Sequence, residues 1–237
     1  MNNFKIFSKK IISRKLYIIV EARSTSKRLK NKHLYKFQRL SLIRILIKKL
    51  KKLKNINGII LSTTTNKEDD KLVLEAKKEG ILIFRGSELN VLDRVLKTCT
   101  KFKLKEFCRV TGDCPLIDIK YLQLLINNYL LNYSLDFISN SVNMPTGQGG
   151  SIVKVNAIKK ALKYSKKNKK FREFITLYII KNKQKFKTMF LYHGEKIKNQ
   201  TKRFGLDTKK DIDFIKKVSK KFNLLDLTLD QLIKFKY

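Results

Sequence analysis

The stretch LYIIVEARSTSKRLKNKHL, residues 16–34, determines how the rest of the chain is interpreted. It begins with an apolar, β-branched run of the kind that forms a buried strand. It then passes directly into a loop that carries several arginine and lysine side chains beside small hydroxyl residues. An ordinary surface loop needs polar residues, but not this density of positive charge and hydrogen-bond donors. The combination predicts that the loop binds a polyphosphate group.

Apolar runs like the first one recur along the chain and alternate with longer helical patterns. Further strands are expected at residues 57–63, 81–85 and 106–110. Leucines at helical spacing between Leu42 and Leu53 predict a helix between the first two strands, and a second helix is expected to end at Gly80. This alternation predicts an α/β protein with a mostly parallel, mixed sheet and helices on both faces. Ligands of such sheets bind at the carboxyl ends of the strands.

The second half of the chain has a less regular pattern. We expect strands within residues 135–142, 144–155, 186–193 and 202–207, and helices within residues 156–167, 171–180 and 208–222. No internal repeat or low-complexity linker divides the chain. We therefore expect a basic extension, residues 1–15, and one domain, residues 16–237, in which residues 134–156 are a candidate dimerisation arm. The extension lacks an apolar core and a cleavage site, which favours an ordinary extension over a targeting segment.

Composition excludes some classes of protein. A hydrophobic content of 43% over 237 residues is sufficient for a folded core, which excludes a disordered chain. The net charge is +36, but the lysines are spread over many segments and form no basic stripe interleaved with aromatic residues. This distribution argues against a dedicated nucleic-acid surface. No apolar run reaches the ~20 residues that a membrane span needs.

The three cysteines, Cys99, Cys108 and Cys114, form no C-x-x-C pattern and cannot all be paired with one another. Their number and spacing argue against a disulfide framework and favour the reducing cytoplasm. Neither histidine lies near Cys114 in sequence to activate a thiolate. We therefore interpret Cys114 as a small, semi-apolar packing residue.

The charged loop after the first strand is not a Walker P-loop, because the G-x-x-x-x-G-K-[ST] pattern is absent. Its residues nevertheless suit a polyphosphate. Arg23 and Arg28 can bind phosphate oxygens in a bidentate manner, and Lys32 offers a compact charge. The hydroxyl and main-chain N–H groups of residues 24–26 can add further hydrogen bonds. A solvated basic loop would have nearly the same composition.

The stretch RVTGDCPLID, residues 109–118, places a carboxylate just beyond the end of another predicted strand. Gly112 permits close approach of the main chain to a ligand, and Asp113 follows it. A carboxylate in this position can hold Mg²⁺ while water and phosphate fill the other metal positions. Asp118 is instead interpreted as the N-cap of the next helix.

The stretch RFGLDTKKDIDF, residues 203–214, has a similar arrangement, because Asp207 directly follows the last predicted strand. Thr208 and Asp211 fit a capping box, which does not use Asp207. Asp207 can therefore join Asp113 at the same sheet edge and supply a second carboxylate to the metal.

Seven segments of the chain resemble, in their order, cytidylyltransferases of the spore coat polysaccharide biosynthesis protein F type. These are relatives of the acylneuraminate and 3-deoxy-manno-octulosonate cytidylyltransferases, which are CMP-sugar synthetases. The segments are ARSTSKRLKNKHL, LSTTTNKEDD, IFRGSELNVLDRVL, RVTGDCPLID, FISN, REFITLYI and LDTKKDIDFI. They extend over residues 16–220, and the ordered set is more specific than any one motif. The resemblance implies a Rossmann-like nucleotide-diphospho-sugar transferase fold, CTP as a substrate and Mg²⁺ as a cofactor.

The resemblance also implies roles for individual residues. Nucleotide binding is expected at Ala22, Arg23, Ser24, Thr25, Ser26, Arg28, Lys32, Thr111, Gly112 and Asp113. Among these, Arg23, Lys32 and Asp113 are the expected catalytic residues, and Asp113 and Asp207 are the expected Mg²⁺ ligands. The sugar is expected near Asn140, Gly147, Arg172 and Glu173.

Several positions depart from the family pattern. A glycine is usual where Thr25 stands, a Pro-Gly pair where Lys30 and Asn31 stand, a histidine where Phe174 stands, and an acidic pair around Gly149 and Ser151. The first loop would hold phosphates less closely as a result. The altered acidic pair leaves open whether the chain turns its substrates over.

The function implied is activation of an acidic sugar by CTP, which gives a CMP-sugar and pyrophosphate for surface polysaccharide biosynthesis. Two other interpretations stay open: a non-catalytic nucleotide-binding homologue in polysaccharide assembly, and a basic RNA-binding protein. We expect a cytoplasmic homodimer that binds CTP and an acidic sugar. The sequence identifies neither the sugar nor a general base, and metal-assisted ionisation of the hydroxyl could replace that base.

Overall fold

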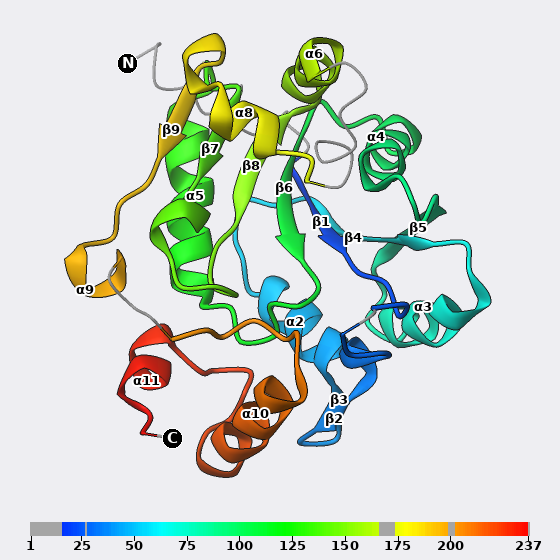
Figure 1. Ribbon diagram of the computed structural model, residues 1–237, viewed down its shortest axis with the longest axis vertical. Coiled ribbons are helices and arrows are strands. Elements are labelled where there is room, and N and C mark those ends of the chain that lie inside the picture. The colour runs from blue at the N-terminus through cyan, green and yellow to red at the C-terminus, as the bar shows by residue number, and fades with distance from the viewer. Residues whose placement is uncertain (1–15, 27, 166–173, 199–201, 237) are drawn as a thin grey trace, which may run out of the picture.

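The computed structural model describes residues 16–26, 28–165, 174–198 and 202–236, and within them the main strands form one seven-stranded mixed sheet (Figure 1). The strand order is β5-β4-β1-β6-β8-β7-β9. The strands are β1 (Tyr17–Glu21), β4 (Gly58–Thr64), β5 (Leu82–Gly86), β6 (Glu106–Thr111), β7 (Phe137–Ser139), β8 (Ser151–Lys154) and β9 (Thr188–Phe190). Neighbouring strands are parallel except at β8, which is antiparallel to β6 and β7. The predicted mostly parallel, mixed sheet is confirmed.

The centre of the sheet is formed by the β-branched runs that the sequence predicted as strands. Residues 18–20 of β1 are fully buried, because β4 and β6 flank this strand and helices cover both faces of the sheet. Glu21, the last residue of β1, pairs with Ser62 of β4 and with Thr111 at the end of β6. The loops that follow β1 and β6 therefore leave the sheet side by side at its carboxyl edge.

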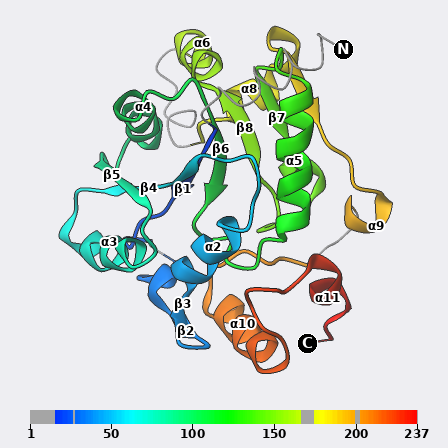
Figure 2. The same cartoon turned by 180° about the vertical axis from the view of Figure 1, so that it is seen from behind.

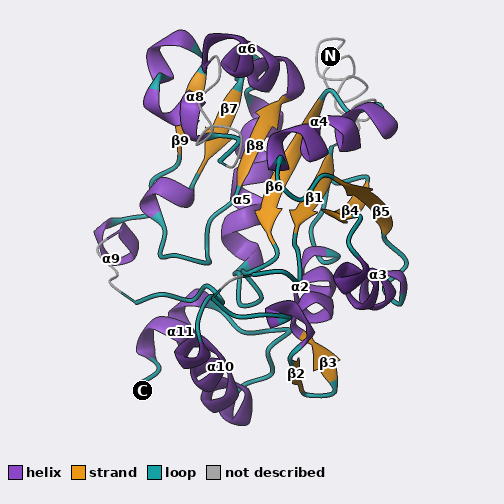
Figure 3. Cartoon of the chain, turned by 45° about the vertical axis from the view of Figure 1, so that its right-hand side comes forward, coloured by secondary structure: helices purple, strands orange, loops and turns teal. Residues whose placement is uncertain are grey.

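Successive residues of each strand point to opposite faces, so the sheet contributes to two cores. Ile18 and Val20 face one core with helices α2, α3 and α5, while Ile19 faces the other with α4, α6 and α8. The helices are α2 (Leu42–Leu50), α3 (Asp70–Lys77), α4 (Val91–Lys101), α5 (Ile119–Leu131), α6 (Val155–Ser165) and α8 (Leu177–Lys181). Figure 3 shows the strands between the two helical layers, and Figure 2 shows the layer that contains α2 and α5. The prediction of helices on both faces is confirmed.

A third core lies beyond the carboxyl edge of the sheet. There α10 (Lys209–Lys221) and α11 (Leu229–Lys234) pack with Leu42 and Ile45 of α2. Smaller elements are the hairpin strands β2 (Lys36–Phe37) and β3 (Leu40–Ser41), helix α9 (Glu195–Lys198) and the 3-10 helices η1 (Lys32–Leu34), η2 (Lys67–Asp69), η3 (Ser141–Asn143) and η4 (Lys183–Lys185). The sequence predicted α10, but α11 and the hairpin are too short to show a recognisable period.

The last predicted strand, residues 202–207, is not a strand, and this prediction was wrong. The segment makes backbone hydrogen bonds to two different loops, from Phe204 N to Thr146 O at 2.8 Å and from Leu206 N to Asp113 O at 2.8 Å. A strand would need consecutive bonds to one partner. These two bonds nevertheless hold residue 207 beside the end of β6.

Other predicted boundaries differ in detail. β7, β8 and β9 are each shorter than the runs that suggested them, and α2 ends before Leu53. The helix expected at residues 171–180 begins in the structure at Leu177, and residues 166–173 lie outside the described residues, as does the predicted basic extension. The candidate dimerisation arm, residues 134–156, contains β7 and β8 of the main sheet. Among the described residues, no helix has the length and apolar character required to cross a bilayer.

Candidate active site

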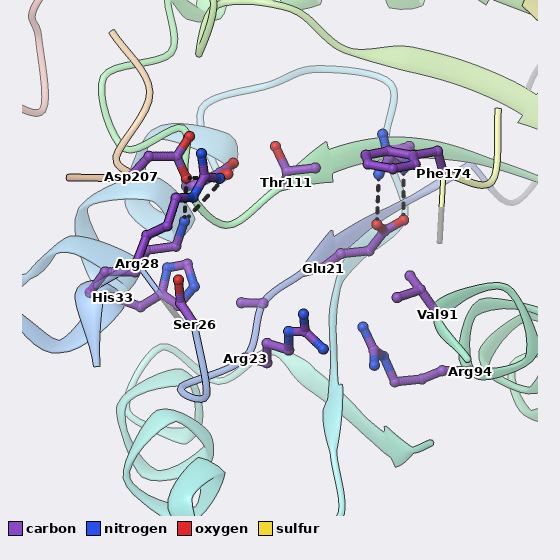
Figure 4. Close-up of a pocket in the computed structure, with 14 residues that line it drawn as sticks. Glu21, Arg23, Ser26, Arg28, His33, Val91, Arg94, Thr111, Phe174 and Asp207 are labelled. Carbon is purple, nitrogen blue, oxygen red and sulfur yellow. Dashed lines mark hydrogen bonds and ion pairs between the residues drawn. The ribbon is translucent and has the colours of Figure 1, made fainter. Parts of the chain in front are cut away.

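A cavity of about 360 Å³ opens at the carboxyl ends of β1 and β6, where the two loops predicted to carry chemistry meet (Figure 4). Among the described residues, its lining consists of Glu21, Ala22, Arg23, Ser26, Arg28, Lys32, His33, Val91, Arg94, Arg109, Thr111, Asp113, Phe174 and Asp207. This set contains five arginine or lysine residues and three carboxylates, so the cavity favours an anionic ligand. The sequence predicted eight of these positions: residues 22, 23, 26, 28, 32, 111, 113 and 207.

Asp69, the last residue of η2, anchors the loop after β1 by a hydrogen bond, and the sequence analysis did not single it out. The main-chain N–H of Ser24 donates to Asp69 Oδ1 at 2.6 Å, and the hydroxyl groups of Thr63 and Thr64 donate to Oδ2 at 2.8 and 2.5 Å. Burial acts to raise the pKa of Asp69, but the hydrogen bonds from Thr64, Ser24 and Thr63 outweigh it and the net pKa is lowered. Asp69 is therefore a buried, charged anchor for the loop.

Two predicted nucleotide-binding residues of this loop do not line the cavity. Ser24 is 2% exposed, and its N–H is already used by Asp69. The Thr25 hydroxyl donates to the carboxylate of Glu88, which also accepts a 2.5 Å hydrogen bond from Asn66 Nδ2. Arg23 lies 3.8 Å from the same carboxylate. The Ser24 N–H and the Thr25 hydroxyl thus stabilise the conformation of the loop, and contact of these two residues with a nucleotide stays a prediction.

Lys32 brings the two predicted metal carboxylates together. It is 7% exposed, and its Nζ donates to the main-chain oxygen of Leu206 at 2.7 Å and to Asp207 Oδ1 at 3.0 Å. The same Nζ lies 3.5 Å from Asp113 Oδ2. Arg28 and Arg203 each bind Asp207 at 3.0 Å. Asp113 and Asp207 therefore face one space, as the sequence predicted, although no final strand precedes Asp207.

Close backbone packing positions Asp113. Gly112 N donates to Glu21 O at 2.8 Å, and a Cβ on Gly112 would lie 2.6 Å from the Cβ of Ala22, so only glycine fits between the two loops. Burial acts to raise the pKa of Asp113, but Lys32 and the Thr111 hydroxyl outweigh it, and the net pKa is lowered. Asp113 is thus held as a carboxylate.

His33, next to Lys32, is a buried neutral residue in the cavity wall. Its Nδ1–H donates to Gly112 O at 3.1 Å, which couples the first loop to the Asp113 loop. Burial and the neighbouring Lys32 lower the pKa of His33 to about 4. The cavity is therefore lined by an uncharged imidazole near neutral pH.

The far half of the cavity contains residues that the sequence analysis did not assign. Arg109 donates to both oxygens of Glu21 at 2.8 Å, so these two strand residues form a bidentate ion pair. Arg94 and Val91 come from the start of α4, and Phe174 lies on the same side of the cavity in Figure 4, opposite Asp207 and Arg28. A charged residue within or at the end of an otherwise apolar strand, such as Arg109 or Glu21, was the available sequence signal.

The residues predicted to bind the sugar are placed elsewhere or not described. Asn140 is fully buried; its Oδ1 accepts from Gly150 N at 2.8 Å. A Cβ on Gly147 would lie 2.4 Å from Gly205 N, so this loop packs against the segment before Asp207. Neither residue lines the cavity, and both hold neighbouring loops in place. Arg172 and Glu173 lie outside the described residues.

The two altered positions near Asn140 also lie away from the cavity lining. Ser151 is buried in β8, and a Cβ on Gly149 would collide with Ser141 at 2.4 Å. By contrast, Phe174 does line the cavity and is 50% exposed. All three cysteines are buried, and burial raises the pKa of each thiol, to about 12 for Cys99 and Cys108. The interpretation of Cys114 as a packing residue is confirmed.

The carboxylates of Asp113 and Asp207 fit an oxygen-liganded divalent cation. Their nearest oxygens are no more than 6.5 Å apart, the sum of their distances to Lys32 Nζ. Mg²⁺ takes carboxylate oxygens and leaves its other positions to water and phosphate. The ligand type therefore suits the metal that the resemblance implies, and Lys32 Nζ lies between the two carboxylates in this structure.

An open α/β sheet with a basic, carboxylate-bearing cavity at its carboxyl edge is typical of proteins that bind nucleotides. A cytidylyltransferase family model matches residues 17–232. The spore coat polysaccharide biosynthesis protein SpsF of Bacillus subtilis is 29% identical over 210 residues, 87% of each chain. An uncharacterised protein of Methanocaldococcus jannaschii is 36% identical over 221 residues, 93% of this chain and 90% of that one.

Solved structures agree with these matches. A cytidylyltransferase from Leptospira borgpetersenii superposes with a TM-score of 0.85 at 27% identity, covering 92% of each chain. The fold is shared with a CMP:2-keto-3-deoxy-manno-octonic acid synthetase complexed with CTP, with a TM-score of 0.65 at 12% identity over 88% of this chain and 99% of that one. The chain belongs to the cytidylyltransferase family, and it is a CTP-utilising nucleotidyltransferase.

Proposed function

We propose that this chain catalyses attack by the anomeric hydroxyl of an acidic sugar on the α-phosphorus of CTP, which forms a CMP-sugar and releases pyrophosphate. The single observation that carries the proposal is the position of Lys32 between Asp113 and Asp207 in the cavity. A buried cation and two carboxylates at the carboxyl edge of the sheet suit a triphosphate with a divalent cation. The Bacillus relative named for polysaccharide biosynthesis supports a role in making surface polysaccharide.

Five residues of the cavity have roles in this proposed reaction. Arg23 and Arg28 would hold the triphosphate, and the Arg28 side chain is 66% exposed, so its guanidinium can turn from Asp207 to a phosphate without crossing packed residues. Lys32 would offset the charge that develops on the pyrophosphate leaving group. Asp113 and Asp207 would hold Mg²⁺, which supplies charge neutralisation and lowers the pKa of the attacking hydroxyl.

Pyrophosphate release from CTP, UTP, GTP and ATP with Mg²⁺, in the presence of a panel of sugar acids and neutral sugars, tests the proposal. We expect turnover with CTP and one class of sugar acid. Turnover with neutral sugars alone, or with a purine nucleotide in preference to CTP, would contradict it. The nucleotide preference rests on family membership, because no described residue identifies the base by its geometry.

The non-catalytic alternative is favoured by one observation. Phe174, an apolar side chain, lines the cavity where the resembling family usually has a titratable histidine. A non-catalytic homologue would bind CTP but would release no pyrophosphate with any sugar in the panel. Calorimetric measurement of CTP binding, beside the turnover screen, therefore separates the two functions.

The proposed homodimer is tested separately by light scattering after size-exclusion chromatography.

A further inference from the structure

Of the arginine and lysine side chains that the structure describes in the cavity lining, Arg94 is the most deeply buried, being 2% exposed near the start of α4. Its NH1 donates to the main-chain oxygen of Ser87 at 2.6 Å. Its Nε is buried and has no hydrogen-bond partner within the described residues. Burial acts to lower the pKa of Arg94, although an arginine stays charged at all ordinary pH values.

The other four basic residues of the lining have acidic partners. Within the described residues, Arg23 lies 3.8 Å from Glu88, Arg28 and Lys32 each lie 3.0 Å from Asp207, and Arg109 binds Glu21 at 2.8 Å. No carboxylate of the described residues lies within 4 Å of the Arg94 guanidinium. Among neighbouring carboxylates, Glu21 acts most strongly on Arg94 through its charge, but Arg109 occupies both of its oxygens.

A buried charge without a counter-ion is costly to the ligand-free protein. Desolvation of an ion is offset only by hydrogen bonds and an opposite charge, and Arg94 has one hydrogen bond to an uncharged oxygen. Figure 4 shows its guanidinium directed toward that of Arg23, across the cavity. Two guanidinium groups that face each other repel one another unless an anion lies between them. Arrangements of this kind persist where function requires them.

We infer that Arg94 is the buried receptor for an anionic oxygen group of a substrate, bound in the half of the cavity that Val91, Arg109 and Phe174 complete. This inference rests on the proposed function. It assigns the anionic group to the acceptor sugar, because the proposed function places the phosphates of CTP at Arg28 and Lys32, in the other half of the cavity. The same chemistry could come from a phosphate of the nucleotide, and the experiment has an arm for each source.

The test compares wild-type protein with Arg94→Gln, Arg94→Lys and a control, Arg44→Gln. Arg44 lies on α2, binds Glu79 at 2.7 Å and does not line the cavity. CTP with Mg²⁺ is titrated first by calorimetry. Sodium sulfate, a stand-in for the acceptor anion, is then titrated against protein saturated with CTP, at constant ionic strength. Thermal melts of each ligand-free variant complete the set.

We expect sulfate to bind the CTP-saturated wild type and Arg44→Gln with similar affinity. Its affinity for Arg94→Gln should be lower by about tenfold or more, and Arg94→Lys should recover part of the loss. The ligand-free Arg94→Gln protein should melt no lower than wild type, because an unpaired charge has been removed. A tenfold loss of CTP affinity instead would keep the inference and assign the anion to the nucleotide.

Equal binding of CTP and of sulfate by Arg94→Gln and wild type would overturn the inference. Failure of the proposed function has a different signature: no pyrophosphate release in wild type, whether or not CTP binds. Sulfate titration of the nucleotide-free protein still tests Arg94 in that case.

Discussion

The main-chain N–H of Ser24 donates a 2.6 Å hydrogen bond to the buried carboxylate of Asp69, 45 residues further along the chain. The N–H that an isolated loop would offer to a phosphate is thus used to fix the loop itself. The loop can then present Arg23 and Arg28 to the cavity in a fixed conformation, which reduces the entropy lost on binding.

Asp69→Asn should therefore weaken both the fold and nucleotide binding. The amide keeps one oxygen acceptor but loses the charge, so we expect a loss of about 2–4 kcal/mol in the free energy of unfolding and a clear loss of CTP affinity. The neighbouring Asp70, whose side chain is 54% exposed and paired with Arg85, is the control; Asp70→Asn should cost under about 1 kcal/mol. Urea denaturation and calorimetry measure the two effects. Equal effects of the two substitutions would show that Asp69 is not an anchor.

Arg23→Lys tests whether the loop acts through geometry or through general positive charge. Lysine keeps the charge but loses the planar fork, so CTP affinity should fall about tenfold or more. Lys51→Ala, which removes a charge at the end of α2 beside Glu79, should change CTP affinity little. If both variants bind CTP equally well, the loop is only a solvated basic surface.

Asp113→Asn and Asp207→Asn should each reduce turnover by about 100-fold or more, and the double variant should lose little beyond either one, because groups that act as a unit are not additive. Asp213→Asn, an exposed carboxylate of α10, is the matched control. Pyrophosphate release over a Mg²⁺ titration measures the effect. Near-normal activity in Asp207→Asn would leave Asp207 with a structural role only.

The same two variants should differ in stability. Asp207 binds Arg28, Lys32 and Arg203, so Asp207→Asn leaves the buried Lys32 with Asp113 as its remaining charged partner. We expect it to cost about 1–3 kcal/mol in melts without metal, and Asp113→Asn to cost less, since its contact with Lys32 is longer. The reverse order of stability would contradict the placement of Lys32.

His33 should make stability depend on pH between about 6.5 and 4. Its folded-state pKa, about 4, lies below the unfolded value of 6.5, so the unfolded chain binds more protons in that window. The stabilisation is present above pH 6.5 and is lost as pH falls toward 4, by about 3 kcal/mol. His33→Asn keeps a donor for Gly112 O but cannot titrate, so its stability should change less over this range. Parallel pH profiles of unfolding would contradict the buried neutral histidine.

Gly147 and Gly194 have similar positive φ angles, 89° and 92°, but different surroundings. A Cβ on Gly147 would meet Gly205 N at 2.4 Å, while nothing lies within 4 Å of one on Gly194. Gly194→Ala should cost about 1–2 kcal/mol of backbone strain, and Gly147→Ala at least about 3 kcal/mol. Gly147→Ala should also reduce turnover, because the displaced segment carries Asp207. Equal melting temperatures would show that the two segments can separate without cost.

Local patterns in the sequence were sufficient to predict the sheet, most of its helices and half of the cavity. Periodicity acts over neighbouring residues, so the central strands and α2 could be recognised from side chains alone. The capping box of Thr208 and Asp211, and the N-cap Asp118, are formed within one helical turn and were predicted correctly. The positions of Arg28 and Asp113 followed from one rule, that loops at the carboxyl ends of parallel strands meet.

Tertiary structure alone decided what each polar side chain touches. Lys32 reaches Asp207 across 175 residues, and no local pattern encodes that distance. Ser24 was expected to face the ligand and faces Asp69, because a backbone N–H can bind either and only packing selects one. Asp207 reached its place through two isolated hydrogen bonds instead of a strand. The unpaired charge of Arg94 is visible only after α4 has been packed against the sheet, since burial is a property of the fold and not of the residue.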